Sequence, residues 1–127
     1  MFESLDLTKM ARAMAAQAGA RRGVIARNVA QADTPGYKAM DLPDFATSYQ
    51  AASSGGMRAT RTGHLTSAAK MMDPVVRPSG GEASPDGNTV SLAREMVKSV
   101  DARQQHDMAL SVYRAASEIV RTSLGRR

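Results

Sequence analysis

The chain has 127 residues, and its 17 Lys and Arg against 12 Asp and Glu give a formal charge of +5. Alanine accounts for 22 of its 54 apolar residues. Leu, Ile, Val and Phe together make up only 20 of the 127 residues, about 16% of the chain, which is below the roughly 20% typical of globular proteins. A large self-sufficient core is therefore not expected. Instead, helix faces made of small residues are expected to be buried against other copies of the chain or against related proteins. The absence of Cys excludes disulfides, thiolate metal sites and Cys nucleophiles.

The first residues predict no Sec-type signal peptide. Glu3 and Asp6 lie where such a signal carries only positive charge, and Lys9 and Arg12 interrupt the apolar runs. Nowhere do about 18 apolar residues follow one another, so no membrane span is expected either. A soluble protein, or one exported by an unusual route, is predicted.

Proline and glycine divide the chain into three parts, because all five prolines and seven of the ten glycines lie between residues 34 and 88. This predicts an N-terminal helix within 1–33, a loop-rich central segment over 34–88 and a C-terminal helix within 89–127. We therefore expect an all-α fold in which the two long terminal helices pair as a coiled-coil-like unit. The long central segment is expected to be mostly irregular and can hold a short β-ribbon.

The first helix is predicted over residues 5–32. Ser4 is its expected N-cap, and Pro35 ends it by about Thr34, since the residue before a proline disfavours the helical region. Apolar residues recur along it at steps of three, four or seven, which predicts one buried face. These residues are Leu7, Ala11, Met14, Ala18, Ile25, Val29 and Ala32.

The second helix is predicted from about Asn88 to Leu124, with Asn88 or Thr89 as its N-cap and Gly125 after its end. Apolar residues occupy one sector in its first half but spread over about half the circumference in its second half, so that half must touch more than one neighbour. Between the halves lies a polar belt, residues 101–107, which is expected to line a hydrated channel or contact another subunit.

The two helices are predicted to face each other and neighbouring subunits through their larger apolar side chains. The expected interface residues are Leu7, Met14, Ala18, Ile25 and Val29 on the first helix, and Leu92, Met96, Val100, Leu110 and Val120 on the second.

The central segment shows no convincing helical or strand period, so most of it is expected to be loop. Residues 57–62, Met-Arg-Ala-Thr-Arg-Thr, alternate weakly and could form a short edge ribbon.

Candidate catalytic and metal-binding patterns are weak. His64 and His106 lie 42 positions apart without a spaced set of further ligands, which argues against a zinc site. No nucleophile elbow, phosphate loop or H-E-x-x-H motif occurs, so no enzyme, catalytic residue, metal or cofactor is expected. Asp41 and Asp44 flank Pro43 and are expected to cap turns rather than to act as an acid and base pair.

A basic cluster keeps one alternative open. Arg21, Arg22, Arg27 and Lys38, with a sequence pI near 10.1, are compatible with a basic helical nucleic-acid-binding protein. Only five aromatic residues occur in the chain, no reader motif is present, and acidic residues are interleaved on both helices. A solvated or inter-subunit charged face is the favoured interpretation.

The sequence Thr34-Pro35-Gly36-Tyr37 predicts a type II turn, with proline second and glycine third. The third position requires φ near +80°, which glycine adopts freely.

Three segments carry a resemblance. Residues 25–38, Ile-Ala-Arg-Asn-Val-Ala-Gln-Ala-Asp-Thr-Pro-Gly-Tyr-Lys, closely resemble the helix-end motif of bacterial flagellar basal-body rod proteins. Residues 85–90 followed by 94–96 resemble the start of the last helix in the proximal-rod member, and residues 60–65 resemble its short middle motif. The G-Y-V-x-x-P-N-V type of sequence found in the sibling FlgC is absent. The matching positions include Asn28, Asp33, Thr34, Pro35, Gly36, Tyr37, Lys38, Asp86, Gly87, Asn88 and Thr89.

The resemblance implies an axial structural protein whose helix pairs stack helically into the rod that carries torque outward from the membrane ring and encloses part of the export channel. It implies passage through the flagellar type III export gate without a cleaved signal, to a periplasmic rod. The implied partners are further copies of the chain, rod proteins of the FlgC, FlgF and FlgG type, the rod-base adaptor FliE, and MS-ring and export-gate proteins. Nucleic acids and small-molecule substrates are not among them.

Overall fold

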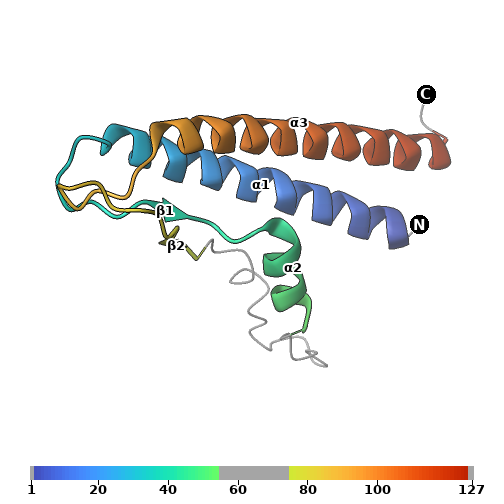
Figure 1. The fold of residues 1–127 in the computed structure, drawn as a ribbon. Coiled ribbons are helices and arrows are strands. Elements are labelled where there is room, and N and C mark those ends of the chain that lie inside the picture. The colour runs from blue at the N-terminus through green and yellow to red at the C-terminus, as the bar shows by residue number, and fades with distance from the viewer. Residues whose placement is uncertain (1, 55–74, 126–127) are drawn as a thin grey trace.

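Two long antiparallel helices dominate the computed structural model, which describes residues 2–54 and 75–125 (Figure 1). Helix α1 spans Phe2–Ala30, and helix α3 spans Leu92–Ser123. At about 1.5 Å per residue, their 29 and 32 residues extend over about 44 and 48 Å. The start of α1 lies beside the end of α3 (Figure 1). The predicted all-α class, with paired terminal helices, is confirmed.

The seam between the helices is built mainly from alanine. On α3, Ala102, Ala109 and Ala116 recur every seven residues and are at most 1% exposed. On α1, Ala11 and Ala18 follow the same spacing and are each 3% exposed. Small side chains let two helix backbones approach closely, and a seven-residue period keeps the contact on one stripe. Because alanine buries little area, the core of the single chain is thin.

The predicted pairing through large apolar residues is wrong for the start of α3. Leu92, Met96 and Val100 are 47%, 66% and 65% exposed and face away from the seam. Close approach of the backbones selects the smallest side chains, which leaves the larger ones of α3 outside. Among the other expected residues, Ala18 and Ile25 are buried, Met14, Leu110 and Val120 are partly buried, and Leu7 and Val29 are 37% and 43% exposed.

Both predicted N-caps are also wrong. Helix α1 begins at Phe2, so Ser4 lies inside it. The N-cap of α3 is Ser91, whose side chain makes no capping hydrogen bond. The end of α3 is as predicted, because Gly125 follows it with φ of +67° and its N–H donates to the Thr122 carbonyl at 3.1 Å.

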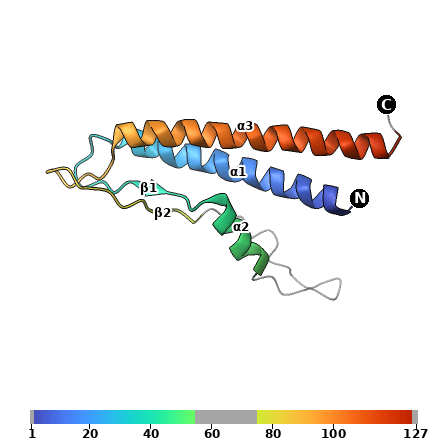
Figure 2. The same ribbon diagram turned by 45° about the vertical axis from the view of Figure 1, so that its right-hand side comes forward.

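The central segment contains more regular structure than its sequence predicts. Strands β1 (Met40–Asp41) and β2 (Arg77–Pro78) form a two-stranded antiparallel sheet that pairs Met40 with Pro78. Helix α2 (Phe45–Ser54) projects away from the long pair (Figures 1 and 2). Helix α2 was not predicted, since its ten residues are too few to show a clear period. Within it, the centroids of the Phe45 and Tyr49 rings, one turn apart, lie 5.3 Å from each other.

Some expectations fall outside the part of the chain that the structure describes. The ribbon expected over residues 57–62, the histidine at position 64 and the motif over 60–65 all belong to this group. In the described ranges, no helix combines the length and apolar character needed to cross a membrane.

Candidate functional site

The predicted turn after α1 is confirmed as type II. Gly36 has φ of +73°, and the Tyr37 N–H donates to the Thr34 carbonyl at 3.3 Å. Apart from its two neighbours in the chain, no described residue has an atom within 4 Å of the place where a Cβ on Gly36 would stand. The backbone conformation, and not the lack of space, therefore requires glycine here.

A second glycine turn precedes α3 and stacks on the first. The Gly87 N–H donates to the Ser84 carbonyl at 2.8 Å, and Gly87 has φ of +81°. The Gly36 N–H donates to the Asp86 carbonyl at 2.9 Å, and a Cβ on Gly87 would lie 3.5 Å from the Gly36 Cα. The two motif segments, far apart in sequence, therefore form one contact.

Asn88 caps the turn that follows α1 instead of the start of α3. Its Nδ2 lies within hydrogen-bond distance of three carbonyl oxygens, those of Gln31 at 3.0 Å, Ala32 at 2.7 Å and Thr34 at 2.9 Å. Its Oδ1 accepts a hydrogen bond from the Val90 N–H at 2.8 Å. These carbonyls belong to the turn that follows α1, where the chain no longer makes regular helical hydrogen bonds, so a buried amide donor here satisfies them.

The backbone around the turns is tied by further motif residues. The Thr89 N–H donates to the Tyr37 carbonyl at 3.1 Å, and the Thr89 Oγ1 accepts from the Ala39 N–H at 2.8 Å. The Lys38 Nζ donates to the Gly87 carbonyl at 2.9 Å. Asp33 differs, because its side chain is exposed and has no partner among the described residues.

Asn28 links α1 to three other segments. It is fully buried, and its Nδ2 donates to the Met40 carbonyl at 2.7 Å and to Glu95 Oε2 at 3.0 Å. Its Oδ1 accepts from the Met40 N–H at 3.1 Å and from the Tyr37 hydroxyl at 3.2 Å. The side-chain amide thus makes four hydrogen bonds, to three residues.

A chain of charged groups continues from Asn28 across the molecule. Glu95, 2% exposed, accepts a hydrogen bond from the Lys98 Nζ at 3.1 Å. The same Nζ lies 3.0 Å from Asp41 Oδ2, and the Arg21 Nε lies 3.1 Å from Asp41 Oδ1. We call Asn28, Tyr37, Asp41, Asn88, Glu95, Lys98 and Arg21 the junction cluster.

The charges of the junction cluster reinforce one another. Burial favours the neutral form of Asp41, but hydrogen bonds from Lys98 and Arg21 outweigh it and lower the pKa of the Asp41 carboxyl below its ordinary 3.8. Burial likewise disfavours the charged Lys98 amine, but hydrogen bonds to Asp41 and Glu95 raise the pKa of Lys98 above 10.5. Asp41 and Lys98 therefore carry opposite charges at neutral pH.

The roles of Glu95 and Lys98 were not predicted from the sequence. Glu95 lies seven residues before Ala102, so it occupies the same stripe as the buried alanines. A charged residue on a stripe of alanines was the available signal for a buried polar contact. Asp41 was expected to cap a turn, but it lies in strand β1, where its Oδ1 accepts from the Leu42 N–H at 2.8 Å; its ion pairs were not foreseen.

The basic cluster is divided by the fold. Arg21 is bonded to Asp41, and Lys38 to the Gly87 carbonyl. Only Arg22 and Arg27 remain as exposed cations without a partner among the described residues. Two of the four cations are therefore engaged in bonds within the chain.

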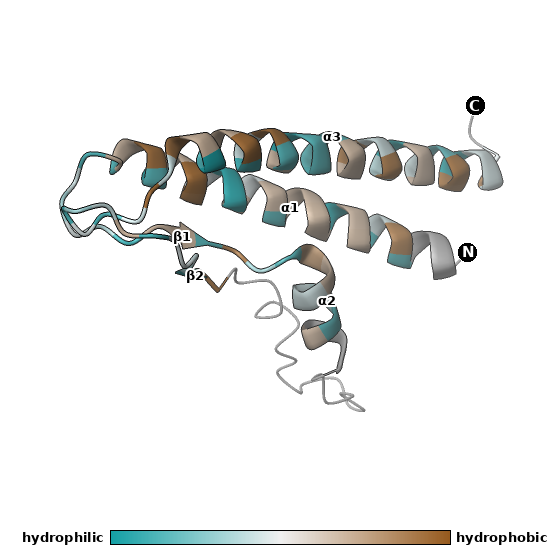
Figure 3. Cartoon of the chain, viewed as in Figure 1, coloured by the Kyte–Doolittle hydropathy of each residue, from teal (hydrophilic) through white to brown (hydrophobic). Residues whose placement is uncertain are grey.

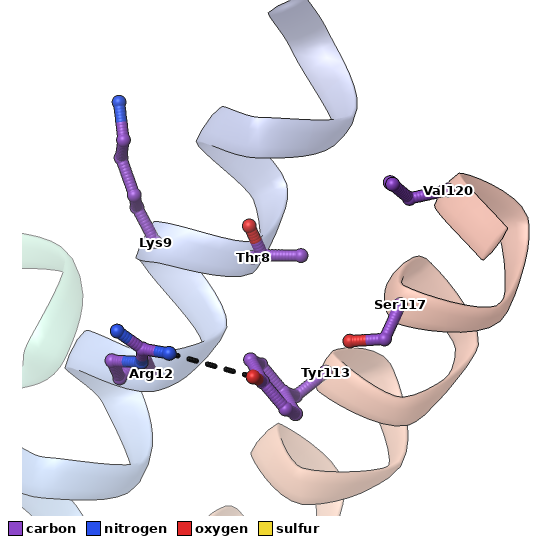
Figure 4. Close-up of a pocket in the computed structure, with 6 residues that line it drawn as sticks. All are labelled: Thr8, Lys9, Arg12, Tyr113, Ser117 and Val120. Carbon is purple, nitrogen blue, oxygen red and sulfur yellow. Dashed lines mark hydrogen bonds between the residues drawn. The ribbon is translucent and has the colours of Figure 1, made fainter. Parts of the chain in front are cut away.

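A groove opens where the helices diverge, between the start of α1 and the end of α3 (Figure 4). Its volume is about 380 Å³. Across it the Arg12 guanidinium donates to the Tyr113 hydroxyl at 3.4 Å, and this hydrogen bond lowers the pKa of Tyr113. The groove is lined by Thr8, Lys9, Arg12, Tyr113, Ser117 and Val120. Among the residues that the structure describes, no group of three His, Asp or Glu side chains is placed to hold a metal ion.

Comparisons with known proteins give a consistent answer. No protein-family model matches the chain. The flagellar basal body rod protein FlgB of Agrobacterium fabrum is 31% identical over 119 residues, which cover 90% of this chain and 89% of that protein. FlgB of Escherichia coli is 37% identical over 101 residues, 72% of each chain, and FlgB of Salmonella typhimurium is 34% identical over 102 residues, 72% of this chain and 73% of that one. The chain therefore belongs to the FlgB family of flagellar basal body rod proteins.

Proposed function

We propose that this chain is a structural subunit of the proximal rod, which assembles helically, transmits torque from the membrane ring and forms part of the export channel. Its role is mechanical and involves no catalysis. Family membership supports a rod component, and the shape of the chain supports the rest of the proposal. A long, narrow helix pair can be stacked side by side with many copies into a stiff tube.

The observation that carries this proposal is the exposed apolar face of α3. Met96, Val97 and Val100 are 62–66% exposed, and Met108 and Ile119 are 51% and 61% exposed. Hydrophobic stretches recur along α3 (Figure 3). Exposed apolar area of this extent marks an interaction surface, because a monomer gains nothing from it. We therefore keep Leu92, Met96 and Val100 as interface residues, now toward neighbouring subunits instead of α1.

The junction cluster gives the subunit its stiffness at the end where the chain reverses. Asn28 and Glu95 fix α1 against α3, and Asn88 holds the turn that follows α1. Satisfied buried polar networks specify one arrangement, because any shift leaves buried groups unpaired. A subunit that transmits torque needs such a fixed relation between its two helices.

The polar belt of residues 101–107 supports a hydrated environment around this part of α3 in the assembled rod. Asp101, Arg103, Gln104 and Asp107 are exposed, whereas Ala102 packs on α1. We propose that this stretch faces the export channel or a neighbouring subunit. Like other parts of the proposal, this assignment concerns the assembled rod.

The site of action follows from the same proposal. The chain passes through the flagellar type III export gate without a cleaved signal and functions in the periplasmic rod. Its proposed neighbours are copies of itself, rod proteins of the FlgC, FlgF and FlgG type, the adaptor FliE, and proteins of the MS ring and export gate.

The test is purification of basal bodies from a strain whose only copy of this gene carries an affinity tag. We expect the chain to copurify with intact rods, and a deletion strain to lack both rods and motility. Normal rods in the deletion strain would contradict the proposal. High-affinity binding of the purified chain to nucleic acid at about 0.2 M salt would instead favour the alternative, since nonspecific binding weakens steeply with salt.

A further inference from the structure

The outer face of α1 is a stripe of small residues flanked by cations. Ala16, Gly19, Gly23, Ala26 and Ala30 follow one another at steps of three and four, and all five are exposed. No described atom lies within 4 Å of a Cβ built on Gly19 or Gly23. Between residues 7 and 32 the chain carries five cations and no carboxylate. At about 100° per residue, Arg22 lies on one side of the stripe and Arg27 on the other.

The outer face of α3 is a stripe of larger apolar residues flanked by carboxylates. Val97, Met108 and Ile119 are exposed, and Met108 helps to line a shallow hollow of about 600 Å³ on this face. At about 100° per residue, Asp101 lies on one side of the stripe, and Asp107 and Glu118 on the other. Asp101 and Glu118 are exposed and form no ion pair within the described residues, whereas Asp107, also exposed, lies 3.9 Å from the Arg103 Nε and 3.7 Å from the His106 Nδ1 of its own helix.

The charges on the two faces match in spacing when the helices run antiparallel. From Arg12 to Arg22 to Arg27 the steps are 10 and 5 residues, about 15 and 7.5 Å. From Glu118 to Asp107 to Asp101 the steps are 11 and 6 residues, about 16.5 and 9 Å. When the faces meet, Arg22 and Asp107 fall on the same side of the contact, and Arg27 and Asp101 on the opposite side.

The apolar residues fit the same register. In an antiparallel pair, two residues that lie opposite each other have numbers with a constant sum. If Arg22 lies opposite Asp107, this sum is about 129, and Met108 then lies opposite position 21. Met108 then enters the gap between Gly19 and Gly23, where the absence of side chains leaves room for it. Large residues packed against small ones fill space without voids.

We propose that the outer face of α3 binds the outer face of α1 of a second copy, antiparallel, with Arg12, Arg22 and Arg27 paired to Glu118, Asp107 and Asp101. This inference rests on the proposed function, whose subunit contact it specifies. Neighbouring copies can be related by a rotation about an axis parallel to the helices and a translation along that axis. Because α1 and α3 are antiparallel within one chain, α1 of one copy is then antiparallel to α3 of the next. The contact joins different surfaces, so every copy can bind two others and the assembly continues.

Disulfide trapping tests the register, because the native chain has no Cys. In the variant Gly19→Cys/Ser111→Cys the two thiols lie on opposite sides of one chain but at the same level of the proposed contact. Oxidation of the concentrated full-length protein is expected to give a ladder of dimers, trimers and longer species on a non-reducing gel.

The control variant is Gly19→Cys/Ala93→Cys. Ala93 is exposed on the same side of α3 as Ser111, but 18 residues away, which is about five helical turns. Its level in the proposed register is position 36, beyond the end of α1 at Ala30. An equally strong ladder from the control, or no ladder from the first variant, would overturn the inference.

Charge reversal tests the ion pairs separately. Arg22→Glu and Asp107→Arg are each expected to slow ladder formation in the Gly19→Cys/Ser111→Cys background by about fivefold. An equal mixture of the two reversed chains should restore it, since each then meets an opposite charge on its neighbours. Failure of the mixture to recover would overturn the pairing.

Failure of the proposed contact can be distinguished from failure of the proposed function. A chain that copurifies with basal bodies but forms no ladder would remove this contact and leave the rod assignment intact. A ladder from a chain that is absent from basal bodies would support the contact and contradict the rod assignment.

Discussion

Asn28 on α1 and Glu95 on α3 are hydrogen-bonded across the helix seam, with 3.0 Å between Nδ2 and Oε2, and both side chains are at most 2% exposed. The bond lies at the end of the pair where the chain leaves α1 and enters α3 (Figure 1). Since the seam is otherwise built mainly from alanine, this polar contact fixes the register of two helices whose small side chains would otherwise permit sliding.

Replacement of Asn28 by Leu is expected to lower the free energy of unfolding by about 3 kcal/mol, because it leaves the Met40 backbone and a Glu95 oxygen buried without that partner. Urea unfolding followed by circular dichroism measures the loss. Asp33→Ala is the control, since Asp33 is exposed in the same motif and has no partner among the described residues. Equal stability of the two variants would show that the buried amide does not hold the helices.

Gly36→Val is expected to abolish motility while protein synthesis continues. A β-branched residue at φ of +73° is strained by about 1–3 kcal/mol in every subunit, and the error redirects the chain after α1. Gly36→Asn is the matched variant, because asparagine tolerates this region of φ and no neighbour obstructs its side chain. Swimming assays and electron microscopy of basal bodies should show rods with Asn and none with Val. Intact rods in the valine strain would mean that the turn relaxes without consequence.

Asn88→Asp is expected to destabilise the chain more than Asn88→Ala at neutral pH. Alanine removes the donor to the carbonyls of the turn after α1, whereas aspartate also brings a negative charge against them. The alanine variant should lose about 2 kcal/mol. Thermal unfolding of both variants at pH 7 and at pH 4 tests this. Protonation of the aspartate returns one hydrogen-bond donor, so the difference in stability between the two variants should be smaller at pH 4. A pH-independent difference would argue against charge as the cause.

Stability is expected to fall as the pH drops below about 4, in part through Asp41. Its pKa is lower in the folded chain than its ordinary 3.8, so its stabilising contribution is present above that value and disappears as the pH falls through the folded pKa. Asp41→Asn should cost about 2 kcal/mol at pH 7 and flatten the acid dependence. Urea titrations between pH 2 and 7 test this, and an unchanged acid limb in the variant would exclude Asp41 as a source of it.

The sequence by itself determined the elements that depend on neighbouring residues. Apolar spacing predicted both long helices to within a few residues at each end, and the order Pro35-Gly36 predicted a type II turn, because local sterics decide φ at such positions. The short helix over residues 45–54 escaped detection, since ten residues carry too little periodicity.

Only the tertiary structure decided which residues meet. Asn88 was expected to cap the helix that follows it, but the fold brings it to the turn after α1, 54 to 57 residues earlier in the sequence. Leu92, Met96 and Val100 were expected at the seam, but alanine holds it, because backbone separation is set jointly by both helices and cannot be read from either one. Local propensity fixes where a helix forms, whereas the face that it buries depends on a partner whose position only the folded chain supplies.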